Sequence, residues 1–190
     1  MNRALVVVDV QESFRARPLW ADTLNPGIAG SVNRLVALAR AAGDLVVWVL
    51  HTEPGSGNPF DPESGHVRLF EELGEPLPGE PLLRKTSHNA FTTTNLQQIL
   101  TGHGVSELRV CGIRAEQCVE TTARVASDLG YAVTFVSDAT TTDPLGRFSA
   151  ADLLERTEAV LRDRFARIAT VAELEAEAAV GPEKVAASAG

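Results

Sequence analysis

The chain has 190 residues, of which 44% are hydrophobic and 22% are charged, a composition typical of a globular domain with a full core. Its net charge is −8 and it has no basic stripe, so we expect no nucleic-acid partner. No apolar run reaches the roughly 20 residues that span a bilayer, and no cleavage site follows the short apolar run at the amino terminus. We therefore expect no signal peptide and no membrane partner.

Apolar runs at intervals along the chain, most of them without alternation, predict the strands of a parallel sheet covered on both faces. They span residues 4–8, 45–50, 82–83, 108–113, 132–136 and 167–171. Apolar residues at helical spacing and glycines that terminate helices predict the helices. These span residues 28–42, 67–73, 92–100, 116–129, 149–165 and 172–179. The segment 52–81 is rich in Gly, Pro and acidic residues, and a loop of this length is usually functional or disordered.

The alternation of strands and helices predicts one domain over residues 1–180, with an α/β fold. We expect a three-layer α/β/α sandwich around a mostly parallel, six-stranded sheet, followed by a flexible tail at 181–190. Open sheets of this kind place their ligand sites at the carboxyl ends of the strands. The polar residues at those ends are Asp9, His51, Lys85, Cys118 with its preceding turn, and Asp138.

Two cysteines, Cys111 and Cys118, lie at the two ends of one predicted strand–turn–helix unit, an arrangement that is awkward for a disulfide. Reduced cysteines favour a cytoplasmic location. The chain has no CxxC pattern, and its four histidines show no metal-ligand spacing, so we expect no metal site and no cofactor.

Cys118 is a candidate nucleophile because it lies in the first turn of a predicted helix, where helix amides and the helix dipole favour a thiolate. Such a nucleophile needs a base, a positive charge and donors for the oxyanion. Asp9 and Lys85 each follow a predicted strand, so the fold brings both to the edge that carries Cys118. Asp9 is the expected base and Lys85 the expected cation.

These residues belong to sequence motifs that resemble the isochorismatase-like cysteine hydrolases over about residues 4–174. The motifs are Asp9-Val10-Gln11 with Phe14, Lys85 with Asn89-Ala90-Phe91, Gly112-Ile113 with Cys118 six residues after the glycine, and the closing RIATVAEL. The resemblance implies a Rossmann-like isochorismatase-type fold, an Asp-Lys-Cys triad on Asp9, Lys85 and Cys118, a small-molecule substrate, and a homodimer or larger homo-oligomer.

The resemblance also implies a cis peptide bond between Ile113 and Arg114, with the backbone amides of Arg114 and Cys118 as the oxyanion hole. The family often carries a small residue where this chain has Arg114. We expect the substrate pocket to be lined by residues near these motifs: Gln11, Phe14, His88, Asn89 and Phe91.

Two departures from the family bear on the substrate. Isochorismate hydrolases, which cleave a vinyl ether, generally lack the nucleophilic cysteine, so Cys118 favours hydrolysis of a carbon–nitrogen bond in an amide or carbamoyl compound. Nicotinamidases carry an Asp-x-His metal motif where this chain has His51-Thr52-Glu53. A vinyl-ether hydrolase, a nicotinamidase-like amidase and a non-catalytic thiol sensor remain as alternatives.

Two other protein classes are disfavoured by the residues after the first strand. A dinucleotide-binding domain would need a GxGxxG motif there, and none is present. An aspartate phosphatase would need a second acid where this chain has Gln11.

Overall fold

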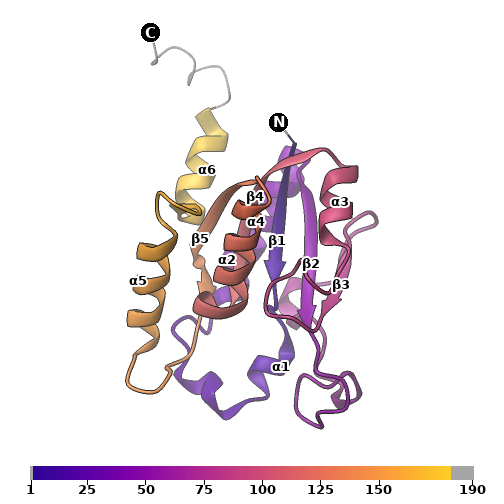
Figure 1. Cartoon of the computed structure of the whole chain (residues 1–190), viewed down its shortest axis with the longest axis vertical. Helices are drawn as coiled ribbons and strands as arrows, with labels where there is room; N and C mark the ends of the chain where they lie inside the picture. Colours follow the sequence, from indigo (N-terminus) through magenta and orange to yellow (C-terminus); the bar gives the residue numbers. More distant parts are fainter. Residues whose placement is uncertain (1, 181–190) are drawn as a thin grey trace.

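A computed structural model describes residues 2–180, and its centre is a sheet of six strands that all run parallel, in the order β3-β2-β1-β4-β5-β6 (Figure 1). The strands are β1 (Asn2–Val8), β2 (Leu45–His51), β3 (Leu82–Lys85), β4 (Val105–Ile113), β5 (Ala132–Thr141) and β6 (Arg167–Ala169). The predicted six-stranded α/β sheet is therefore confirmed, and the predicted tail at 181–190 lies outside the described residues.

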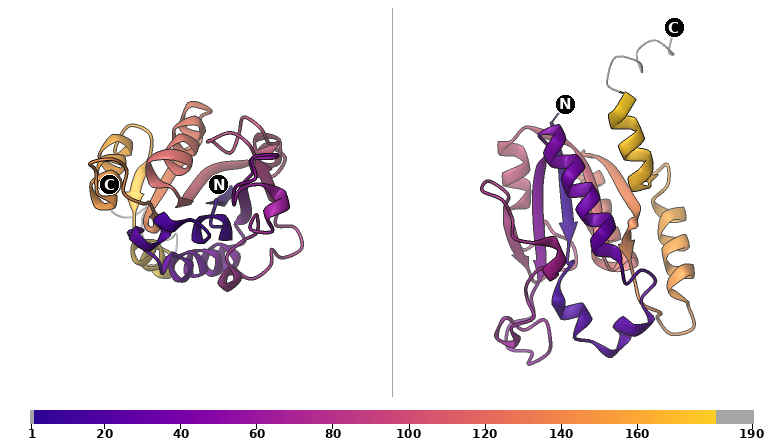
Figure 2. Two further views of the ribbon diagram at one scale, coloured as in Figure 1. Left: turned by 90° about the horizontal axis from the view of Figure 1, so that it is seen from below. Right: turned by 180° about the vertical axis from the view of Figure 1, so that it is seen from behind.

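Helices cover both faces of the sheet and form two separate apolar cores with it. On one face lie α2 (Ile28–Ala42), which crosses the sheet in the right view of Figure 2, and α6 (Val171–Val180). On the other face lie α3 (Leu96–Gly102), α4 (Glu120–Asp128) and α5 (Ala150–Leu161). Alternate residues of β1 point into the two cores, with Leu5 and Val7 packing toward α2 and Val6 toward α4. No helix within residues 2–180 is long and apolar enough to cross a membrane.

Some predicted boundaries are wrong for local reasons. The helix expected at 92–100 begins at Leu96, because the Asn89 side chain first holds a turn by accepting hydrogen bonds from the amides of Phe91 and Thr92. The helix expected at 67–73 is only the 3₁₀ turn η3 (Glu71–Leu73), and the helix expected to continue to residue 165 ends at Leu161.

The segment after β1 contains two short helices that the sequence did not predict. They are α1 (Glu12–Arg15) and the 3₁₀ helix η1 (Pro18–Asp22), both at the lower end of Figure 1. The long loop 52–81 reaches the same end, where the Glu12 amide donates to the Arg68 carbonyl at 2.9 Å. This end is the carboxyl edge of the sheet, so both segments can cover a site there.

β1 lies between β2 and β4. The strands β2 and β3 are added on one side of β1, and β4, β5 and β6 on the other, so the strand order reverses between β1 and β4. This topological switch point is where open α/β sheets place their ligands. The two strands approach closely there: a β-carbon on Gly112 would lie 1.9 Å from the Val8 carbonyl oxygen, and Gly112 has a φ of +131°. Only glycine suits both conditions.

Replacing Gly112 with alanine is therefore expected to destabilise the protein strongly. We expect a loss of at least about 3 kcal/mol in the free energy of unfolding, because the new methyl group meets backbone atoms that cannot rotate away. Urea unfolding followed by circular dichroism measures it. The matched control is Gly30→Ala in α2, where a β-carbon meets nothing within 4 Å and should raise stability by up to about 1 kcal/mol. Equal stability of the two variants would contradict the close approach of β1 and β4.

Candidate active site

Asp9 and Lys85 form a buried ion pair at the carboxyl edge of the sheet. Asp9 directly follows β1, and Lys85 is the last residue of β3, two strands away. The Lys85 Nζ lies 2.7 Å from Asp9 Oδ2, and neither side chain is exposed to solvent. Backbone bonds hold both residues in place, since the Asp9 amide donates to the Val49 carbonyl and the Thr52 amide donates to the Lys85 carbonyl.

Cys118 completes the cluster from the other side of the switch point. It lies on η4 (Ala115–Val119), a π-helical turn that directly follows the end of β4 and continues into α4. The Lys85 Nζ donates a hydrogen bond to Cys118 Sγ at 3.4 Å. One ammonium group thus contacts both the Asp9 carboxylate and the Cys118 sulfur. The structure brings Asp9, Lys85 and Cys118 together, although they are separated by 76 and 33 residues along the chain.

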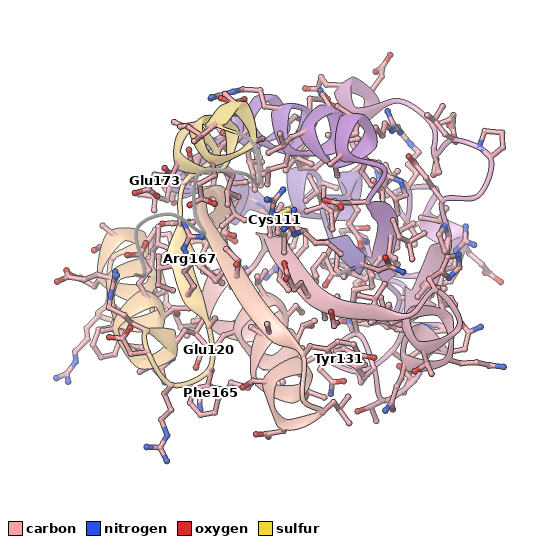
Figure 3. The ribbon with its side chains drawn as sticks, turned by 90° about the horizontal axis from the view of Figure 1, so that it is seen from above. Cys111, Glu120, Tyr131, Phe165, Arg167 and Glu173 are labelled. Carbon is pink, nitrogen blue, oxygen red and sulfur yellow. The ribbon has the colours of Figure 1, made fainter. Side chains whose placement is uncertain are left out.

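The helix that carries Cys118 starts differently from the predicted one. The Val119 amide donates to the Arg114 carbonyl, five positions earlier in the chain, and this bond forms a wider turn than that of an α-helix. Regular α-helix begins only at Glu120, not at Glu116. Figure 3 shows Glu120 between α4 and α5; its carboxylate accepts hydrogen bonds from Arg124 at 2.8 Å and from Thr157 at 3.2 Å. This buried carboxylate ties the start of α4, and hence η4, to α5.

Burial dominates the electrostatics of the cluster. Burial raises the pKa of Asp9, and the Lys85 charge opposes that shift only in part. Burial, together with the Asp9 charge, also raises the pKa of the Cys118 thiol well above its ordinary range, and Lys85 again opposes the shift. The helix amides and dipole favour a thiolate at Cys118, but burial in this cluster shifts the thiol pKa in the opposite direction and favours the thiol. Burial also makes the neighbouring Asp9 carboxylate more basic.

Alkylation of native Cys118 by iodoacetamide should show this protonation state. Because only the thiolate reacts and the thiol pKa is raised, we expect the rate to keep rising with pH above about pH 10, where an ordinary cysteine with a pKa of about 8.5 has levelled off. Peptide mapping separates Cys118 from Cys111, and the unfolded chain in urea supplies the reference rate. A native rate that has already levelled off at neutral pH would contradict the resting thiol.

The turn between β4 and Cys118 has the backbone geometry that the family resemblance implies. The peptide bond between Ile113 and Arg114 is cis. No hydrogen bond from the Arg114 amide to another of residues 2–180 is seen. The Arg114 side chain, which departs from the usual small residue, is held by Asp143 at 2.7 Å in the loop after β5 and lies 6.0 Å from the Phe14 ring.

The expected pocket residues fall into two groups. Phe14 lies at the carboxyl edge and packs edge-on against Phe60, with ring centroids 5.0 Å apart. Gln11 is also there, but it is fully buried and its side chain binds the backbone of His51 instead of lining an open pocket.

The other three expected pocket residues are not brought to the cluster by any contact within residues 2–180. The Phe91 ring stacks on Tyr131, which precedes β5 at the opposite edge of the sheet, the edge that Figure 3 views from above. Asn89 holds the turn before α3, and His88 is exposed. These residues share a sequence motif with Lys85, but in the segment after Lys85 it is the Ser87 carbonyl oxygen that contacts Lys85 Nζ, at 3.1 Å.

His51 and Glu53, which replace the metal motif of nicotinamidases, also lie beside the cluster. The His51 Nδ1 is 3.3 Å from Lys85 Nζ, and its Nε2 is 3.2 Å from a Glu53 carboxylate oxygen. Within residues 2–180 no three His, Cys, Asp or Glu side chains are arranged to hold a metal ion. The sequence marks His51 only as a residue at a strand end, and nothing in its spacing reveals the contact with Lys85.

Comparisons with known proteins find similar sequences and structures over most of the chain. The family model described as "Isochorismatase domain" matches residues 3–173. The streptothricin hydrolase of Streptomyces noursei is 36% identical over 177 residues, which cover 91% of this chain and 61% of that protein. The ureidoacrylate amidohydrolase of Variovorax paradoxus is 28% identical over 73% of this chain and 68% of that protein. The crystal structure of an isochorismatase from Pseudomonas putida superimposes with a TM-score of 0.82 at 33% identity, covering 90% of this chain and 89% of that one.

Proposed function

The chain belongs to the isochorismatase family of hydrolases, and we propose that it hydrolyses a carbon–nitrogen bond of a small amide or carbamoyl compound through a thioester on Cys118. One observation carries this proposal. The Lys85 ammonium contacts both the Asp9 carboxylate, at 2.7 Å, and the Cys118 sulfur, at 3.4 Å, and the side chains of Asp9 and Lys85 are fully buried. A base, a cation and a nucleophile in mutual contact are what acyl transfer to a thiol requires.

In the first step the Cys118 thiol loses its proton to Asp9 as the sulfur attacks the carbonyl carbon and a carbon–sulfur bond forms. Asp9 is suited to this role because burial raises its pKa and makes it a stronger base. The negative charge moves to the substrate oxygen, which the amides of Arg114 and Cys118 bind. When the carbon–nitrogen bond breaks, the leaving amine takes the proton from Asp9, and a thioester remains.

In the second step a water molecule attacks the thioester carbon and gives its proton to Asp9. The carbon–sulfur bond breaks, the carboxylic acid leaves, and the proton returns from Asp9 to the Cys118 sulfur. The net reaction is the amide plus water giving an acid and an amine. Lys85 keeps its positive charge throughout and balances the negative charge as it moves between Asp9, the sulfur and the oxyanion.

Amide hydrolysis is favoured over the two enzymatic alternatives by particular residues. A vinyl-ether hydrolase has no use for the thiol that Lys85 contacts. A nicotinamidase-like site would need a metal-ligand set where His51 instead contacts Lys85. The name of one relative, a ureidoacrylate amidohydrolase, supports the amide proposal, and the name of another, a streptothricin hydrolase, supports hydrolysis. A thiol sensor would need an accessible, acidic thiol, whereas Cys118 is 7% exposed and its pKa is raised.

The assembly of the chain into a homo-oligomer and its cytoplasmic location stay predictions.

A screen of purified protein against small primary amides, carbamoyl compounds and one vinyl ether tests this proposal. We expect ammonia or amine release from at least one carbon–nitrogen substrate, and none from the vinyl ether. Addition of a chelator should leave the rate unchanged. Turnover of the vinyl ether alone, or chelator-sensitive amide turnover, would overturn the proposal in favour of the corresponding alternative.

A further inference from the structure

The Lys85 ammonium has more acceptors around it than it has protons. Four atoms lie within hydrogen-bonding distance of Nζ: Asp9 Oδ2 at 2.7 Å, the Ser87 carbonyl oxygen at 3.1 Å, His51 Nδ1 at 3.3 Å and Cys118 Sγ at 3.4 Å. An ammonium group donates three protons. The carboxylate and the carbonyl oxygen are the two nearest acceptors, so the imidazole and the sulfur compete for the third proton.

His51 is held in the position of an acceptor by bonds to its backbone and to its ring. The Gln11 side chain accepts from the His51 amide at 2.7 Å and donates to the His51 carbonyl at 3.0 Å. On the ring, Nε2 lies 3.2 Å from a Glu53 oxygen, and Glu53 is itself held by Asn58 at 2.6 Å. A carboxylate at Nε2 places the ring proton there and leaves the Nδ1 lone pair facing Lys85.

The surrounding charges keep this imidazole neutral. Burial and the neighbouring Lys85 ammonium both lower the pKa of His51, and Asp9 and Glu53 oppose the shift only in part. The ionisable groups that face it are Asp9 after β1, Lys85 on β3 and Glu53 in the loop after β2. A neutral imidazole can accept a hydrogen bond from an ammonium group, whereas an imidazolium cannot.

We infer that His51 is a positioning residue that shares one Lys85 proton with Cys118: it accepts this proton while Cys118 is a thiol and releases it to the sulfur as the thiolate forms. A thiol is a weak acceptor and a thiolate a strong one, so the Lys85 hydrogen bond moves to the sulfur as negative charge develops there. His51 would thus keep the resting cysteine unreactive without removing the cation that activates it. The inference rests on the proposed function of Cys118 as a nucleophile.

Replacement of His51 tests the inference through the reactivity of the thiol, which can be measured without any substrate. In His51→Leu the third Lys85 proton is left to the sulfur, so we expect Cys118 to react with iodoacetamide about tenfold faster at neutral pH, the change that a one-unit fall in the thiol pKa produces. The pH profile of alkylation should move to lower pH by the same amount. His51→Gln, which retains an acceptor, should stay near the native profile.

Two controls separate this role from a role in packing. His103→Leu removes an exposed histidine at the end of α3, away from Lys85, and should leave the alkylation profile unchanged. Thermal unfolding should show that each variant is folded at the assay temperature. A His51→Leu rate equal to or below the native rate would overturn the inference, and so would an equal increase in His51→Gln, which would indicate simple loosening. Failure to find amide turnover would overturn the proposed function, but it would not change the difference in alkylation rate between the native protein and His51→Leu.

Discussion

Replacing Cys118 with alanine is expected to remove amide hydrolysis by a factor of about 10⁴ or more, as happens when a covalent nucleophile is deleted. The remaining Asp9–Lys85 pair can still orient a substrate, but it has no group that forms the acyl intermediate. The loss should appear in kcat, while the Michaelis constant changes little. Initial-rate kinetics on the best substrate from the amide screen measure both.

Cys111 supplies the matched control for this substitution. It is the other cysteine of the chain, buried in β4 with its pKa raised to about 12 by burial, and it makes no contact with Lys85. Cys111→Ala should retain turnover within a few-fold, with a stability cost of about 1 kcal/mol for the lost packing. Amide turnover that survives in folded Cys118→Ala would contradict the thioester mechanism and point to direct attack by water.

Replacing Asp9 with asparagine should lower turnover by about 10²- to 10⁴-fold, the usual contribution of a positioned general base. The amide keeps the shape of the side chain but cannot take the thiol proton or return it to the leaving amine. It also leaves the Lys85 ammonium without its nearest negative partner. Initial-rate kinetics and iodoacetamide labelling of Cys118 measure the two consequences separately.

Asp44→Asn is the control for removing a carboxylate near basic residues. Asp44 precedes β2 at the opposite edge of the sheet, where it pairs with Arg3 at 3.5 Å, and burial raises its pKa as it does for Asp9. This variant should keep native turnover. If Asp9→Asn retained native turnover, Asp9 would only be the structural partner of Lys85. If Cys118→Ala were tolerated while Asp9→Asn failed, the chemistry would be that of a vinyl-ether hydrolase.

The architecture could be predicted because it depends on long apolar runs whose burial the sequence shows directly. The runs at 4–8 and 45–50 are buried strands, and their order with the helices sets a parallel sheet. The convergence of Asp9, Lys85 and Cys118 also followed from the sequence, because each comes just after a predicted strand and parallel strands share one carboxyl edge. Helix boundaries could not be predicted where a side chain holds a turn before the helix, as Asn89 does before α3.

The protonation state and the surroundings of the site could not be predicted, because they depend on packing between distant segments. The helix position of Cys118 predicts an acidic thiol, but burial against Asp9 reverses the direction of its pKa shift. The contact of His51 with Lys85 joins two strand ends that are 34 residues apart. Phe91 was expected in the pocket by its closeness to Lys85 in sequence, whereas the chain carries it to Tyr131 at the far edge of the sheet.

The central claim, that hydrolysis passes through a thioester on Cys118, is tested most directly by mass spectrometry of the enzyme quenched in acid during turnover. We expect the intact mass to increase by the mass of the acyl group, and peptide mapping to place that group on Cys118. The increment should be released by hydroxylamine and should be absent in Cys118→Ala. Hydrolysis that proceeds with Cys118 unmodified at every quench time, or with the acyl group on another residue, would contradict the account.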